Sequence, residues 1–135
     1  MKKSKKKVFT IIVIVFAVII VIGGVLLLIV TDGLKEGLNV PLDGIDLSEI
    51  ADGVYTGTYE HKRWTNTVRV YVSNNMITKI EIVNDVGAVD VLSISNEVFD
   101  RVINAQNTDI DAVTGATVTS RAYLKAIENA LTIED

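Results

Sequence analysis

The sequence contains no cysteine, and it has only one proline, one tryptophan and one histidine in 135 residues. Without cysteine, the chain can form no disulfide and no metal–thiolate site, and no lipid can be attached to a cysteine near its N-terminus. With a single histidine besides, the sequence offers no Ser/His/Asp or Cys/His arrangement and no spacing typical of metal ligands. We therefore expect no catalytic residue and no metal ligand in this chain.

Acidic residues are missing from the N-terminal region. All 17 acidic residues lie beyond Val30, whereas five of the 13 basic residues are lysines within the first seven positions. The chain beyond Val30 therefore carries 8 basic and 17 acidic residues. The net charge of -4 thus averages a basic end and an acidic remainder.

Charge of either sign is missing from Val8–Val30, which is rich in Ile, Val, Leu and Phe. As a helix, this run would extend roughly 35 Å, which is enough to span a bilayer. A cleaved signal peptide is the competing interpretation, but its apolar region is usually about 7–15 residues and ends at a small-residue cleavage site. Gly23-Gly24 does not resemble such a site, so we predict a transmembrane helix over residues 8–30.

Lysine placement predicts the orientation of this helix. Five lysines precede it, and only Lys35 closely follows it. Because basic residues that flank a membrane helix stay preferentially in the cytoplasm, residues 1–7 should form a cytoplasmic tail and the C-terminal part should be extracytoplasmic. A lysine cluster can also bind anionic lipid or nucleic acid, but topology explains this one, and we expect no nucleic-acid partner.

Residues 31–50 contain three glycines and the only proline, without periodicity at 2 or 3.6 residues, and we expect an extracytoplasmic linker there. Asp46 or Ser48 could cap one helical turn over Asp46–Ile50. Residues 51–135 should then form one small domain.

The first part of this domain has the pattern of an antiparallel sheet. Val54–Glu60 resembles a strand, and Thr67–Ser73 alternates between valines on one face and polar or aromatic residues on the other. Asn74-Asn75 suits a turn, because Asn tolerates positive φ, and a third strand continues through Ile77–Val83. We predict a three-stranded meander followed by a loop over Asn84–Leu92.

Helical patterns follow the strands. Ser95 can cap a helix whose apolar stripe runs to Ala105, and a second helix is expected over Thr119–Leu131. Strands followed by helices predict an α+β domain, with a small antiparallel β-sheet packed with two main helices, after the N-terminal transmembrane helix.

The segment Asp111–Ser120 leads into the last helix and has the properties of a phosphate site. Small residues allow a ligand to approach the backbone, and the helix start offers unpaired N–H groups with a positive dipole end. On these grounds alone, an ordinary capped helix start explains the segment as well. The small residues are Gly115 and Ala116, and the hydroxyls are those of Thr114, Thr117, Thr119 and Ser120.

The spacing Asp111-x-x-Thr114-Gly115-Ala116-Thr117 resembles the D-x-x-S/T-G-A-T flavinylation sequence of the FMN-binding domain family. Asp52–Gly57 also resembles the D-G-x-Y-x-G that opens these domains, and Ile103–Gln106 resembles the family pattern before the motif. The resemblance covers Asp46–Leu131. The loop Asn84–Asp90 departs from it, since the family often has a His-containing or E-T-P-G-like segment near the flavin.

The resemblance implies FMN as the cofactor, joined through its phosphate to the Thr117 hydroxyl by a separate flavin transferase. Asp111 belongs to the sequence that the transferase recognises, and Thr114–Ala116, Thr119 and Ser120 are expected at the cofactor site. The implied function is an electron carrier on the outer face of a bacterial cell membrane, whose partner is a redox protein or a quinone-linked reductase. The alternative is a membrane-tethered binding or accessory module with noncovalent FMN or no flavin.

Three further residues have two interpretations each. His61 and Trp64 could cover the flavin ring, but an exposed hairpin tip explains them as well. Arg121 could neutralise the phosphate, or it could be a solvated helix residue.

Overall fold

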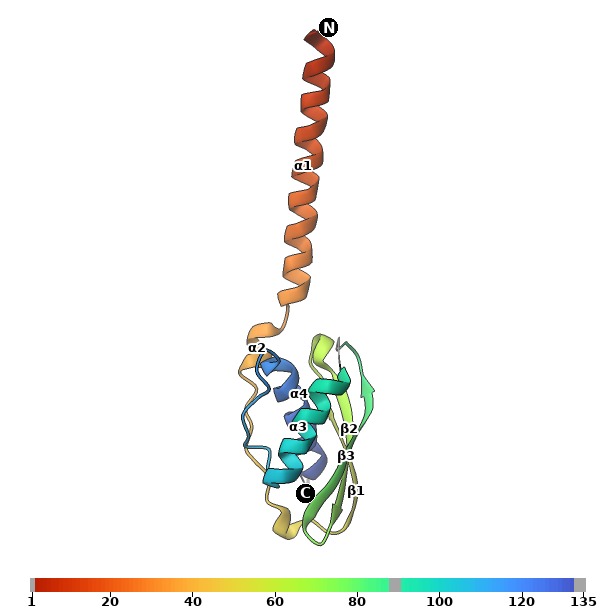
Figure 1. Ribbon diagram of the computed structural model, residues 1–135, viewed down its shortest axis with the longest axis vertical. Helices are drawn as coiled ribbons and strands as arrows, with labels where there is room; N and C mark the ends of the chain where they lie inside the picture. Colours follow the sequence, from red (N-terminus) through yellow and green to blue (C-terminus); the bar gives the residue numbers. More distant parts are fainter. Residues whose placement is uncertain (1, 88–90, 133–135) are drawn as a thin grey trace. The chain divides into compact units, whose positions relative to one another are not determined.

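The computed structural model describes residues 2–87 and 91–132, and the chain divides into two compact units between Asp32 and Gly33. The first unit consists of one helix, α1 (Lys2–Thr31), and the second begins at Gly33 (Figure 1). Residues 88–90, within the expected loop, and 133–135, at the end of the expected domain, lie outside the described residues.

Helix α1 confirms the expected long apolar helix. Its Val, Ile, Leu and Phe side chains between Val8 and Val30 are exposed within the unit, so no protein core accounts for them. Within residues 2–87 and 91–132, it is the one helix long and apolar enough to cross a membrane. By length and composition it fits a membrane span, and a secretory signal segment meets the same criteria.

The sheet confirms the expected meander. Strands β1 (Gly53–Tyr59), β2 (Asn66–Ser73) and β3 (Met76–Asp85) are antiparallel and lie in the order β1-β2-β3. Asn74 and Asn75 form the turn between β2 and β3 with φ of 52° and 57°, as their tolerance of positive φ predicts. β3 continues two residues beyond the expected Val83, because Asn84 and Asp85 pair with Thr67 and Asn66.

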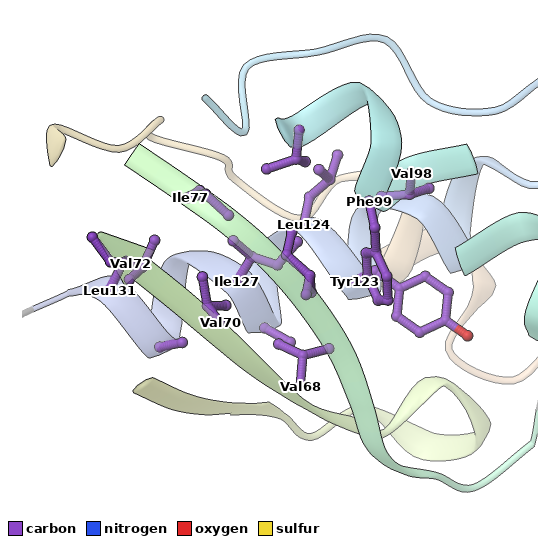
Figure 2. Packing of buried hydrophobic residues seen from close by; sticks show 14 of the residues in the cluster. Val68, Val70, Val72, Ile77, Val98, Phe99, Tyr123, Leu124, Ile127 and Leu131 are labelled. Atoms are coloured by element: carbon purple, nitrogen blue, oxygen red, sulfur yellow. The ribbon is translucent and has the colours of Figure 1, made fainter. Parts of the chain in front are cut away.

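Helices α3 (Val91–Ala105) and α4 (Thr117–Leu131) pack on one face of the sheet and confirm the α+β architecture (Figure 1). The alternation in β2 explains this arrangement, because every second residue from Asn66 to Val72 is buried under the helices. Figure 2 shows the core, with Val68, Val70, Val72 and Ile77 from the sheet and Val98, Phe99, Tyr123, Leu124, Ile127 and Leu131 from the helices.

The segment expected as a linker is packed within the second unit from Gly33 onward. It contains α2 (Leu34–Leu38) and η1 (Leu47–Glu49), a 3-10 turn whose expected cap is confirmed by the Asp46 carboxylate that accepts from Ser48 N. Isolated apolar side chains anchor this segment in the unit, although they follow no helical or strand period. The buried apolar side chains are those of Val40, Leu47 and Ile50.

Both helix starts differ from the expectation. α3 begins at Val91, and Ser95 is not its cap but a buried residue whose hydroxyl donates to Leu92 O at 3.3 Å. α4 begins at Thr117, two residues before the expected Thr119. The first turn of α4 therefore includes the last threonine of the motif.

Gly57 allows β1 to approach α4 at backbone distance. A Cβ at this position would overlap the carbonyl oxygen of Ala126 and the backbone nitrogen of Ala130. These are backbone atoms of a packed helix, so no rotation of a side chain could relieve the overlap.

We expect Gly57→Ala to lower the free energy of unfolding by at least about 2 kcal/mol, because the added methyl group must separate β1 from α4. Denaturant unfolding followed by fluorescence of the single tryptophan, Trp64, measures this change. Gly53→Ala is the matched control on the same strand, since its Cβ would meet the Tyr55 ring at an ordinary 3.6 Å. Equal stability of the two variants would contradict the role of Gly57.

Candidate functional site

The motif forms an open turn before α4. Gly115 has a φ of +80°, a left-handed conformation that favours glycine, and no atom lies within 4 Å of a Cβ built there. Ala116 follows as the N-cap residue and makes no side-chain hydrogen bond to the helix. Thr117 is the first residue of α4, and it is exposed.

The first turn of α4 is available for an anion. Ser120 N donates to Ala116 O at 2.8 Å, and no side chain of the described residues accepts from the backbone N–H groups of Thr117, Val118 or Thr119. Unpaired N–H groups at the start of a helix of 15 residues carry a partial positive charge. This geometry suits a phosphate or a carboxylate.

A cleft of about 370 Å³ adjoins this helix start, within the range of small-molecule sites. One wall of the cleft is formed by residues 115–119. The other wall comes from two other segments: Arg63 and Trp64 of η2 (Lys62–Trp64), and Leu34 and Leu38 of α2. Cationic, aromatic and aliphatic groups therefore face one helix N-terminus.

Trp64 is a wall of the cleft rather than an exposed hairpin tip. Its side chain is 8% exposed and packs with Val118 and Ala122 of α4. The guanidinium carbon of Arg63 lies 4.4 Å from the Trp64 ring centroid, in cation–π geometry. The His61 ring is stacked with the Trp64 ring at a centroid distance of 6.1 Å, and its Nε2 lies 2.9 Å from the carbonyl oxygen of Gly33.

The other motif residues occupy different places. Thr114 is exposed beside the turn and does not line the cleft. Asp111 is exposed on the rim of a second, larger hollow, and its backbone carbonyl accepts from Arg101 Nη1 at 3.0 Å. Thr117 and Thr119 are thus the motif hydroxyls that face the cleft.

Ser120 belongs to the interior rather than to the cleft. Its hydroxyl oxygen accepts from Val113 N at 3.0 Å, and the hydroxyl donates to Ala116 O at 2.8 Å. The Ser120 side chain is fully buried. It therefore holds the turn against the helix from inside.

Arg121 lines the larger hollow, which measures about 840 Å³, and not the cleft at Thr117. Its Nη1 donates to the carbonyl oxygen of Val40 at 3.0 Å, so it ties the segment after α2 to α4. The hollow is larger than the cleft, but it contains neither the helix N-terminus nor the motif hydroxyls. The smaller cleft at Thr117 is therefore the candidate site.

Sequence reasoning missed Leu34, Leu38 and Arg63 as cleft residues. The two leucines lie four residues apart, a spacing that places them on one face of a helix. That spacing could have indicated a short helix with an apolar face, but it is a weak signal in a helix of five residues.

Ser120→Ala should lower the free energy of unfolding by about 1–3 kcal/mol, since it leaves the Val113 N–H without its partner in a packed turn. Thr114→Ala, which removes an exposed hydroxyl from the same turn, should change it by no more than about 0.5 kcal/mol. Denaturant titration of the cofactor-free protein with Trp64 fluorescence tests both. A neutral Ser120→Ala would assign this hydroxyl no structural role.

The chain matches a family of known domains. A family model described as the FMN-binding domain matches residues 64–132, from Trp64 through the end of α4. None of the curated proteins compared with the chain matches it. The match includes the whole motif wall of the cleft and Trp64, whereas α2 lies outside it. The chain belongs to the FMN-binding domain family, and FMN is its cofactor.

Proposed function

We propose that this protein is a membrane-anchored electron carrier in which the phosphate of FMN is ester-linked to Thr117. The observation that carries this proposal is the position of Thr117, which is exposed at the first residue of α4 on the wall of the cleft. An alcohol there lies beside the N–H groups that suit a phosphate. Thr119, the other hydroxyl on this wall, is only half exposed.

The residues of the cleft suit both ends of FMN. The N-terminus of α4 and the Arg63 guanidinium offer positive charge for the phosphate. Trp64, Leu34 and Leu38 offer the apolar surface that an isoalloxazine ring requires. These residues would hold and orient the cofactor, and the apolar ones would exclude water from its ring.

Ester formation requires an accessible alcohol in a turn that the transferase recognises, but no activated nucleophile, because the separate flavin transferase supplies the catalysis. The absence of cysteine and the single histidine are consistent with this division. FMN, when bound, supplies the redox chemistry, and the protein contributes attachment, position and electrostatics. We therefore propose a carrier or subunit rather than a complete enzyme.

The apolar helix α1 supports the anchored form of the protein. Its exposed apolar surface suits lipid, and the lysines before it favour a cytoplasmic N-terminus with the FMN domain outside the bacterial cell membrane. The electron donor or acceptor would then be a redox protein or a quinone-linked reductase of that membrane. A tethered accessory module with noncovalent FMN is the alternative, and it would use the same cleft.

Coexpression with a bacterial flavin transferase distinguishes these functions. We expect the denatured wild-type protein to gain the mass of FMN minus water, on the peptide that contains Thr117. Thr117→Ala should remove the gain completely, whereas Thr78→Ala, at an exposed threonine of β3, should keep it. An unmodified wild-type protein, in cells where a known substrate domain is modified, would favour the noncovalent alternative.

The anchor makes a separate prediction. The full chain should remain in the membrane fraction after an alkaline carbonate wash, and its intact mass should include residues 1–32. Val18→Arg with Ile19→Arg should reduce insertion, since each arginine at the centre of a membrane helix costs about 2.5–3.5 kcal/mol on insertion scales. A soluble wild-type product that lacks α1 would show that the helix is a cleaved signal.

A further inference from the structure

A small, partly enclosed cavity lies next to the cofactor cleft. Its volume is about 10 Å³, and Asn66, Asp85 and Tyr123 line it. Trp64 and Thr119 line both this cavity and the cleft, so the two spaces share a wall. The cavity plays no part in the function proposed above.

Asn66 brings an unpaired acceptor to this cavity. Its side chain is 1% exposed, and its Nδ2 donates to the carbonyl oxygen of Trp64 at 3.1 Å. A carbonyl only accepts, so this bond determines which end of the amide is the oxygen. Asn66 Oδ1 is buried and has no protein partner. A buried acceptor without a partner costs about 1–3 kcal/mol.

Tyr123 and Asp85 add further acceptors. The Tyr123 hydroxyl donates its only proton to Asp85 Oδ2 at 2.6 Å, so the phenolic oxygen itself can only accept from another group. Burial raises the pKa of Tyr123 well above its ordinary value, so this hydroxyl stays protonated at neutral pH. The residues that line the cavity therefore include an amide, a phenol and a carboxylate.

A cavity of this size beside an unpaired buried acceptor admits only a small donor. A volume of about 10–15 Å³ holds one water molecule, and a buried water typically makes about three hydrogen bonds. A cation is the other small occupant that oxygens attract, but Arg63 also lines the cavity, and its positive charge would repel a cation there. The charge and the size of the cavity both favour a neutral molecule.

We propose that this cavity binds one ordered water molecule, which donates to Asn66 Oδ1 and connects the Tyr123–Asp85 pair to the Thr119 hydroxyl at the cofactor cleft. Water satisfies the orphaned amide oxygen, and its second proton serves one of the remaining acceptors. Its lone pair accepts the Thr119 hydroxyl proton. The cleft thus has a polar wall that is coupled through one water to a carboxylate.

The test uses the cofactor-free full chain in detergent micelles, with alanine methyl groups labelled for NMR. Ala122 lines the cavity, and its methyl protons do not exchange with solvent. We expect a water-to-methyl NOE at Ala122 with the sign of a long-lived bound water. Ala126, which is fully buried in the core and does not line the cavity, is the internal control and should show none.

Asn66→Leu removes the acceptor at similar size and should abolish the Ala122 signal. Asn129→Leu is its matched control, because that amide also donates to a carbonyl, Thr58 O, but is exposed and far from the cavity. If Asn66→Leu does not fold, the comparison of the Ala122 and Ala126 methyl NOEs in the wild-type protein still tests the proposal. No NOE at Ala122, or equal signals at Ala122 and Ala126, overturns the proposal whether or not FMN binds.

Discussion

The close contact between β1 and α4 is the constraint on which the arrangement of the second unit depends. Gly57 brings the strand against the helix backbone at Ala126 and Ala130, and this contact determines the depth at which α4 lies on the sheet. Because a helix is rigid, the same contact also positions the first turn of α4, which lies about two turns before Ala126. Val118 and Ala122 meet Trp64 there, and Thr117 reaches the open side of the same turn.

The segment from Gly33 to Ile50 lies beside this helix start, and a cleft is left between them. Gly37 of α2 leaves room for the Val118 side chain, so α2 lies against the first turn of α4. The buried Glu128 of α4 holds the part of the segment after α2, because its Oε1 accepts from Gly44 N at 2.9 Å. The same oxygen accepts from the Thr108 hydroxyl at 2.7 Å. A buried carboxylate needs such partners. The segment thus supplies part of one wall of the cleft, at Leu34 and Leu38.

The motif hydroxyls have two different roles, one structural and one at the surface. Ser120 faces inward and completes the hydrogen bonds of the turn, whereas Thr117 faces outward and leaves the helix N-terminus uncapped. Open N–H groups are stable in water and become a binding site when an anion arrives. The protein stabilises the turn from inside, so that its outer surface remains free for an anion.

The sequence by itself determined the features that depend on local pattern. The uncharged run of α1, the alternation of β2, the Asn74-Asn75 turn and the spacing from Asp111 to Thr117 are all readable because period and turn chemistry act over a few residues. Only the tertiary structure placed Trp64 on the cleft wall and packed residues 33–50 into the second unit. It also turned Ser95 and Ser120 inward. Such burial depends on which distant segment supplies the neighbour, and no local period records that.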